Sequence, residues 1–169
     1  MKNVITSCVA VVLVAISMAF TVRPNDETQQ GSSNLVGKWK FAHFKTTQYK
    51  NDQLHKQDEW STADRKIEIY WEFKSNGDLI ATEKSTTANG KWKLEVLKKE
   101  GSHIKEGKLT LWGFPGVDEL AKMLDMKQLT YNVRTVTIAG SEMLVAEVDA
   151  SKASPPGLKT IFAYSYKKL

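Results

Sequence analysis

Leu35-Val36-Gly37-Lys38-Trp39 opens the first strand that the sequence predicts, and short alternating strands follow it to the last residue. Lysine alternates here with aromatic residues, as in Lys38-Trp39-Lys40-Phe41. In a strand this alternation places the lysines on one face and the rings on the other. Because the period of two recurs along nearly the whole chain, the fold class predicted is all-β.

The alternation divides into eight strands. They are predicted at Trp39–His43, Ile67–Phe73, Leu79–Lys84, Trp92–Val96, Leu109–Trp112, Gln128–Ile138, Met143–Val148 and Thr160–Lys167. Turn residues separate several of them, at Ser75–Asp78, Ala88–Gly90 and Ala139–Ser141, and Lys98–His103 is predicted to be a polar connection. The inward-facing set on the sixth strand shifts near Arg134-Thr135, which predicts a bulge there.

Eight consecutive strands without room for crossover helices predict an antiparallel up-and-down barrel. Closure removes the exposed edges of the sheet, and a barrel of eight strands has an interior that holds one small ligand or is filled by side chains. One segment departs from the period of two. Val117–Leu124 has apolar residues at helical spacing after Pro115-Gly116, so we expect one short helix between strands 5 and 6.

The predicted connections differ in length between the two ends of the barrel. Thr46–Asp64, Ser85–Asn89, Gly113–Lys127 and Asp149–Leu158 would all emerge at one end, and three of them are long. Long loops often carry function. We therefore expect the entrance at this end, with Thr46–Asp64 and the helix as a lid.

Three segments are predicted: a signal peptide at residues 1–19, a disordered polar spacer at 20–33 and a barrel domain at 34–169. Lys2, the apolar run Val4–Phe20 and the small residues before the cleavage point favour export to the periplasm or the cell surface. The alternatives are an uncleaved membrane anchor and a lipoprotein modified at Cys8, the only cysteine, although Cys8 precedes most of the apolar run that a lipobox cysteine follows.

The composition argues against several functions. The net charge is +5, but the lysines alternate with apolar residues instead of gathering on one face, so no nucleic-acid partner is expected. His43, His55 and His103 fall on different elements, which gives no support for a metal site. The chain has no Gly-x-Ser-x-Gly elbow and no phosphate-binding glycine loop. We expect no cofactor and no enzymatic activity.

The opening motif resembles the Gly-x-Trp of lipocalins, and it is most similar to bacterial lipocalin-like domains that begin with a leader, a spacer and Leu-x-Gly-x-Trp. The resemblance covers Asn34 to Leu169. It implies that Gly37 and Trp39 close one end of the barrel, with Lys167 in place of the arginine that often packs across this tryptophan. The chain departs from the lipocalin pattern in two ways. Its lysine cannot stack on the tryptophan as arginine does, and its helix is predicted between strands 5 and 6, whereas lipocalins usually place the helix after the barrel.

Two functions are compatible with this sequence. The first is binding of a small apolar or amphipathic molecule inside the barrel. The residues expected to line that site are Phe41, His43, Trp60, Trp71, Trp92, Leu111, Tyr131 and Tyr164. The alternative is a non-catalytic module, an inhibitor or an envelope scaffold, whose barrel is filled by side chains and which contacts another protein. A cavity smaller than about 300 Å³ would favour the alternative.

Overall fold

The computed structural model describes residues 35–169, so the predicted signal peptide and spacer lie outside the described residues. The elements are β1 (Gly37–Lys50), β2 (Gln53–Ser61), α2 (Thr62–Arg65), β3 (Ile69–Phe73), β4 (Asp78–Glu83), β5 (Thr86–Glu100), β6 (His103–Trp112), α3 (Pro115–Met123), β7 (Leu129–Ile138), β8 (Ser141–Asp149), η2 (Ser151–Ala153) and β9 (Lys159–Lys168).

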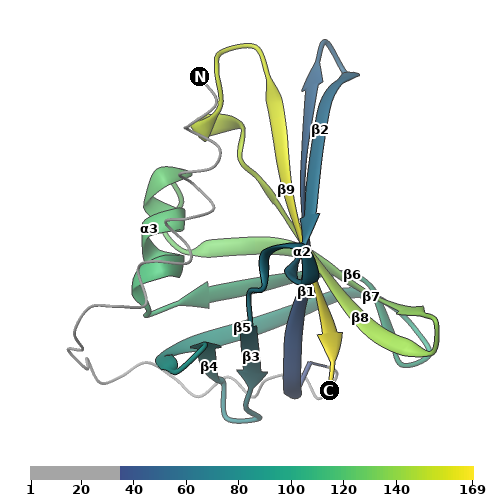
Figure 1. Cartoon of the computed structure of the whole chain (residues 1–169), viewed down its shortest axis with the longest axis vertical. Helices are drawn as coiled ribbons and strands as arrows, with labels where there is room; N and C mark the ends of the chain where they lie inside the picture. The colour runs from purple at the N-terminus through teal and green to yellow at the C-terminus, as the bar shows by residue number, and fades with distance from the viewer. Residues whose placement is uncertain (1–34) are drawn as a thin grey trace.

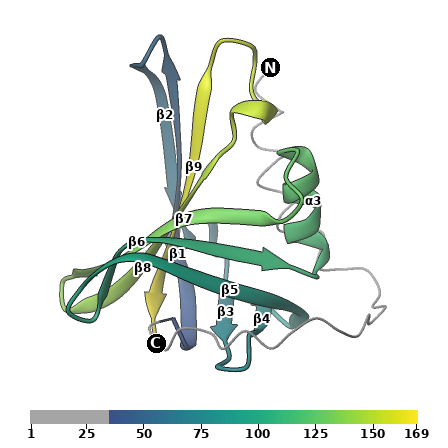
Figure 2. The same cartoon turned by 180° about the vertical axis from the view of Figure 1, so that it is seen from behind.

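The strands form one antiparallel sheet that closes into a barrel (Figures 1 and 2). Each strand from β3 to β8 pairs with the next in the chain, β1 pairs with β3, and the β1–β9 pairing closes the barrel. The barrel wall therefore consists of eight strands, β1 and β3 to β9. The predicted eight-stranded up-and-down barrel, with a helix between β6 and β7, is confirmed.

The strand that is not part of the barrel, β2, pairs with the second half of β1. β9 pairs with β1 from Trp39 to Tyr49 and occupies one side of it. On the other side, β3 pairs with β1 at Gly37–Lys40 and β2 pairs with it from His43 to Lys50. Since a strand has only two sides, β2 and β3 lie along the same edge of β1, with α2 between them.

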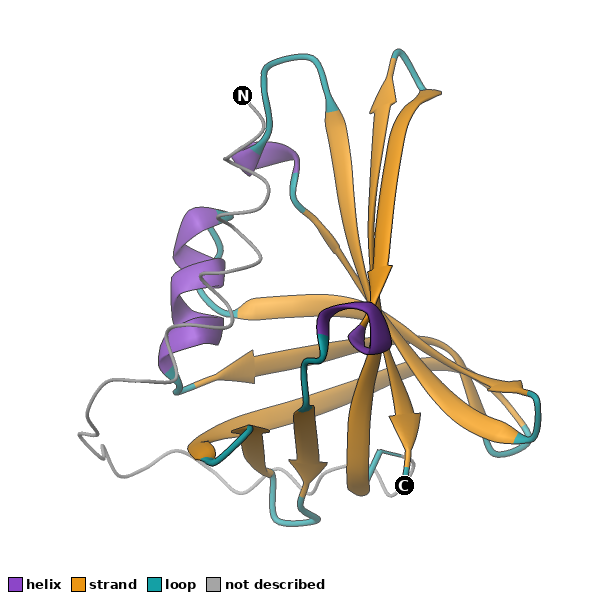
Figure 3. Cartoon of the chain, in the orientation of Figure 1, coloured by secondary structure: helices purple, strands orange, loops and turns teal. Residues whose placement is uncertain are grey.

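The expectation of a loop at Thr46–Asp64 is therefore wrong. This segment is the end of β1, the turn Asn51-Asp52, the strand β2 and most of α2. Both turn residues have positive φ, 51° and 60°, which suits a tight hairpin. We call residues 43–61 the β1–β2 extension; it projects from the barrel next to the start of β9 (Figure 3).

A bulge in β1 decides which side chains face inward. Phe41 pairs with Tyr166 and His43 with Ser165, so Ala42 has no partner on β9. The extra residue shifts the alternation by one position. Phe44 therefore follows Phe41 into the core, whereas His43, expected on the same face as Phe41, lies outside the barrel near Glu59, with its Nε2 3.8 Å from the carboxylate.

Two predicted connections are strand instead. Ala88–Gly90, expected to be a turn within a Ser85–Asn89 loop, lies inside β5, and the chain turns at Lys84-Ser85. Lys98–His103 belongs mostly to β5 and β6, which leaves Gly101-Ser102 as the turn. Asn89-Gly90 resembles a turn in the sequence, but the glycine is needed here for close packing of the chain. A Cβ at position 90 would lie 2.8 Å from the Trp112 carbonyl oxygen and against the Phe114 ring.

The bulge predicted near Arg134-Thr135 is also absent. The pairing of β7 with β8 runs from Asn132 to Ile138 without a shift in register. Thr135 continues the inward-facing set and is buried, with its Oγ1 accepting a hydrogen bond from the Ile104 N–H at 2.9 Å. Ile138 is 58% exposed. A buried threonine with a backbone partner thus occupies the position where apolar spacing indicated a break.

α3 covers one opening of the barrel (Figure 1). Pro115 is in its first turn, and the Asp118 carboxylate accepts the Gly113 N–H at 3.1 Å. Val117, Leu120 and Ala121 form its buried face. Just after the helix, Asp125 forms an ion pair with Lys152 of the η2 segment.

Gly90→Ala is expected to lower the free energy of unfolding by about 1–3 kcal/mol, because the new methyl group would force the Trp112 backbone and the Phe114 ring to move. Urea unfolding measures the change. Asn89→Ala, at the exposed neighbouring position, should stay within about 0.5 kcal/mol of the wild type. Equal effects of the two substitutions would contradict the packing described for Gly90.

Candidate functional site

The interior of the barrel contains a cavity of about 50 Å³. Residues of six strands (β1, β2, β3, β4, β7 and β9) and of α3 with its N-cap surround it. Its lining is Phe41, Trp60, Ile69, Trp71, Ala81, Phe114, Gly116, Val117, Leu120, Leu129, Tyr131, Tyr164 and Tyr166. This volume accommodates a few water molecules at most.

Aromatic rings fill most of the space around the cavity. Trp71 stacks on Tyr166 with centroids 4.4 Å apart, and Tyr166 in turn lies 5.3 Å from Phe41. Tyr131 and Tyr164 meet edge to face at 5.7 Å. Each of these rings buries a large area, and such tilted and edge-on pairs add stability beyond burial. The interior is a packed aromatic core with a small residual void.

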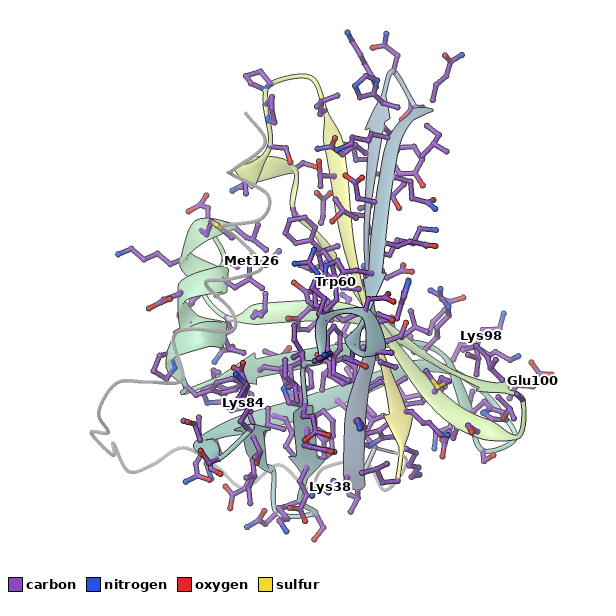
Figure 4. All side chains as sticks on the ribbon, in the orientation of Figure 1. Lys38, Trp60, Lys84, Lys98, Glu100 and Met126 are labelled. Atoms are coloured by element: carbon purple, nitrogen blue, oxygen red, sulfur yellow. The ribbon has the colours of Figure 1, made fainter. Side chains whose placement is uncertain are left out.

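Trp60 lines the cavity on the side of the extension. It is the second-last residue of β2, and its ring lies 5.6 Å from both Phe41 and Phe44. The Arg65 guanidinium lies over the Trp60 ring, 5.1 Å from its centroid. Figure 4 labels Trp60 where the extension joins the barrel. The tryptophan therefore anchors β2 to the core and forms part of the wall of the cavity.

α2 holds Trp60 in this place. Its capping box is formed by Ser61, whose N–H and Oγ donate to the Asp64 carboxylate at 3.0 and 2.7 Å, while the Asp64 N–H donates to Ser61 Oγ at 3.2 Å. The hydrogen bonds from Ser61 lower the pKa of the exposed Asp64 carboxyl. Lys66 ends the helix in a left-handed conformation. This short structure redirects the chain from the extension into β3.

Five of the eight residues expected at an interior site meet at this cavity: Phe41, Trp60, Trp71, Tyr131 and Tyr164. The other three do not. His43 lies outside the barrel, and Leu111 is fully buried elsewhere in the core. Trp92 packs 5.0 Å from Phe73 and donates its indole N–H to the Lys74 carbonyl at 3.0 Å.

Several lining residues were missed by sequence reasoning. Tyr166 alternates with Tyr164 on the last strand, so its inward orientation was recognisable from the period of two. Val117 and Leu120 were recognised as the apolar face of a helix that was expected to act as a lid, but they were not named as lining residues. Phe114 is placed by its contact with Gly90, a close approach that depends on the folded chain.

Trp39 occupies the opposite end of the barrel. It is fully buried, and its indole N–H donates to the Leu35 carbonyl at 2.8 Å. Gly37 begins the strand with a φ of 128°, a conformation that favours glycine. The ammonium over the Trp39 ring, 5.3 Å from its centroid, belongs to Lys168, which also pairs with Glu142 at 2.8 Å. The expected residue, Lys167, is exposed, because the alternation that turns Tyr166 inward turns Lys168 toward Trp39.

Two phenols in the core are strongly perturbed. Burial raises the pKa of Tyr131 well above its ordinary value, and the neighbouring Tyr164 adds to the rise. Burial also raises the pKa of Tyr166, with further contributions from Tyr131 and Tyr164. Both hydroxyls are therefore neutral at physiological pH. A group of neutral phenols offers hydrogen bonds but no charge to a molecule in the cavity.

Other features of residues 35–169 carry little chemistry. No three histidine, cysteine, aspartate or glutamate side chains in that range are placed to hold a metal ion. None of the helices described there has the length and apolar character needed to cross a membrane. An open hollow of about 570 Å³ runs along the outside of α3, where Lys122, Asp125 and Lys127 contribute to its walls.

Comparisons of the chain with protein-family models, with curated proteins and with solved structures found no match. The fold itself, an eight-stranded closed antiparallel barrel, is consistent with the calycin type. Membership of the lipocalin family stays a prediction from the sequence motif.

Of the five tyrosines in the chain, Tyr131 and Tyr166 are expected to ionise only when the protein unfolds. Their pKa is raised in the folded state, whereas an unfolded phenol ionises near pH 10, so unfolding releases protons above about pH 10 and stability falls as the pH rises further. Phenolate absorbance followed together with circular dichroism tests this. Ionisation of all five before any loss of structure would contradict it.

Proposed function

We propose that this protein is a non-catalytic protein-interaction module, exported to the periplasm or the cell surface, whose barrel is filled by side chains. The fold supplies a rigid support, and the β1–β2 extension presents the binding surface. The leader-like N-terminal sequence supports export, and the unpaired edge of β2 is the observation that carries the proposed interaction.

The small size of the cavity supports an external function. Ligand sites of ordinary size begin at about 300 Å³, and the cavity in this barrel is about 50 Å³. Trp60, Trp71 and Tyr166 occupy the space that a ligand would need. An interior ligand of ordinary size therefore requires large rings to move out of a packed core.

The edge of β2 supports binding through the backbone. Among residues 35–169, β2 pairs only with β1, and its residues Gln53–Glu59 are all exposed. Peptide groups on the free side of such a strand offer hydrogen bonds to a further strand. Leu54, 61% exposed, adds an apolar contact near the tip.

A small apolar ligand inside the barrel is the second candidate. One observation favours it: five of the residues predicted for an interior site line the same void. Trp60 lines that void at the junction with the extension, and outward movement of its ring is the simplest route to a larger cavity. In this case the module would bind its ligand at the junction of the extension and the barrel.

Replacing Trp71 distinguishes a packed interior from a hollow one. Trp71 is 6% exposed and stacks on Tyr166, so Trp71→Ala should lower the free energy of unfolding by about 3–5 kcal/mol. Tyr70 precedes Trp71 and lies on the outer face of β3, so Tyr70→Ala should lower the free energy of unfolding by about 1 kcal/mol or less. Denaturant titrations provide both values. A small cost for Trp71→Ala together with a gain or loss of ligand affinity would favour the second candidate.

Photo-cross-linking in the native cell tests the interaction directly. A benzophenone amino acid at Leu54 on β2 should form a covalent adduct with a protein, whereas the same group at Leu97, 54% exposed on β5, should not. Native mass spectrometry of protein from its own envelope fraction should show no small molecule that is lost on denaturing. Adducts at neither position, with such a molecule present, would overturn the proposed function.

A further inference from the structure

The free edge of β2 has a charge pattern that is complementary to itself. The central residues of the strand are Lys56, Gln57, Asp58 and Glu59, with His55 before them. Two identical strands related by a twofold axis pair antiparallel, and a residue at the axis then faces its own copy. The axis must pass through a residue, because an axis between two residues would pair side chains that lie on opposite faces of the sheet.

Only one centre in this stretch brings opposite charges together. With Gln57 on the axis, Lys56 faces the second copy's Asp58, and this pair occurs twice by symmetry. With Lys56, Asp58 or Glu59 on the axis, two like charges would face each other, which is unfavourable. Gln57 also suits the centre chemically, since an amide donates to and accepts from its own copy.

The structure places these groups as the pairing requires. Lys56 and Asp58 lie opposite Gln48 and Thr46 of β1 and therefore share one face of the extension. Their side chains are 53% and 55% exposed and already meet each other at 2.5 Å. A register shift between Gln48 and Tyr49 leaves His55 without a partner on β1, so the regular part of β2 begins at Lys56.

We propose that the partner of the β2 edge is a second copy of this chain, paired antiparallel about Gln57. The two extensions then form one continuous sheet in the order β9-β1-β2-β2-β1-β9, and no pairing within either barrel changes. This inference rests on the proposed function, since it names the partner for the same surface. In this dimer, backbone hydrogen bonds between the two β2 strands provide the affinity, and the charge pairs determine the register of the strands.

A second stretch that pairs on one side carries a different pattern. Lys93–Glu100 of β5 pairs with β6 and has no partner in β4, which ends its pairing at Lys91. Three of those eight residues are lysines, at positions 93, 98 and 99. Lysines on an edge oppose strand addition. β2 contains one lysine, Lys56, among its nine residues, so its edge opposes strand addition less than this one does.

Two complementary charge variants test the pairing. Asp58→Lys places only positive charges, and Lys56→Asp only negative charges, at the positions that face each other. Each variant alone should weaken self-association about tenfold or more relative to the wild type. An equimolar mixture of the two should form a heterodimer, because the opposite charges then face each other again. The double variant Lys56→Asp/Asp58→Lys should also recover the dimer.

The measurement is sedimentation velocity of the full chain over a concentration series at low ionic strength, where exposed charge pairs are least screened. Controls with the same change in net charge are Glu119→Lys on α3 and Lys108→Asp on β6, both exposed and away from β2. They should leave the association unchanged. Circular dichroism should show that every variant keeps the fold, since an exposed ion pair contributes little to it.

The outcomes separate this inference from the proposed function. A wild-type chain that stays monomeric, or variants that associate alone as well as when mixed, would overturn the dimer. Cross-linking at Leu54 to a different protein would then retain the interaction module with another partner. Conversely, recovery of association only in the mixture establishes the β2–β2 pairing even if a ligand is found inside the barrel.

Discussion

The pairing of β1 with β9 is the constraint on which the rest of the structure depends. The two strands are matched from Trp39 to Tyr49, with one bulge at Ala42. This pairing closes the barrel, aligns Phe41 and Phe44 with Tyr166 and Tyr164, and so assembles the rings that fill the interior. It also continues past the barrel wall and leaves the second half of β1 as a template for β2.

Much of the fold could be predicted from the sequence because most strands have one face in the core. Where that holds, apolar residues alternate, and the period of two is visible. β2 is exposed on both faces over Gln53–Glu59, so it has no alternation and resembles a loop. The bulge at Ala42 could not be predicted either, because an extra residue is defined only by the partner strand. His43 was misplaced for that reason.

The same limit applies to the candidate site. Sequence reasoning found the tyrosines and tryptophans that turn inward, because burial of a large ring on an alternating strand is a local pattern. It did not give the volume that those rings leave. That volume depends on how α3 lies across the opening and on how closely Phe114 approaches Gly90, both of which are contacts between distant parts of the chain. A barrel is hollow or filled according to such contacts, whatever its strand number.

The extension is informative because it is ordered without a core of its own. An isolated two-stranded ribbon is marginal in water, yet β2 is fixed at one end by Trp60 and the α2 capping box, and β1 is held by β9 along its other side. The exposed strand is thus ordered when the barrel folds, so the entropy of ordering it is lost before any partner binds. Binding to a strand that is already ordered loses less free energy to ordering. Barrel closure pairs most of the sheet on both sides, whereas this arrangement keeps the edge of β2 exposed.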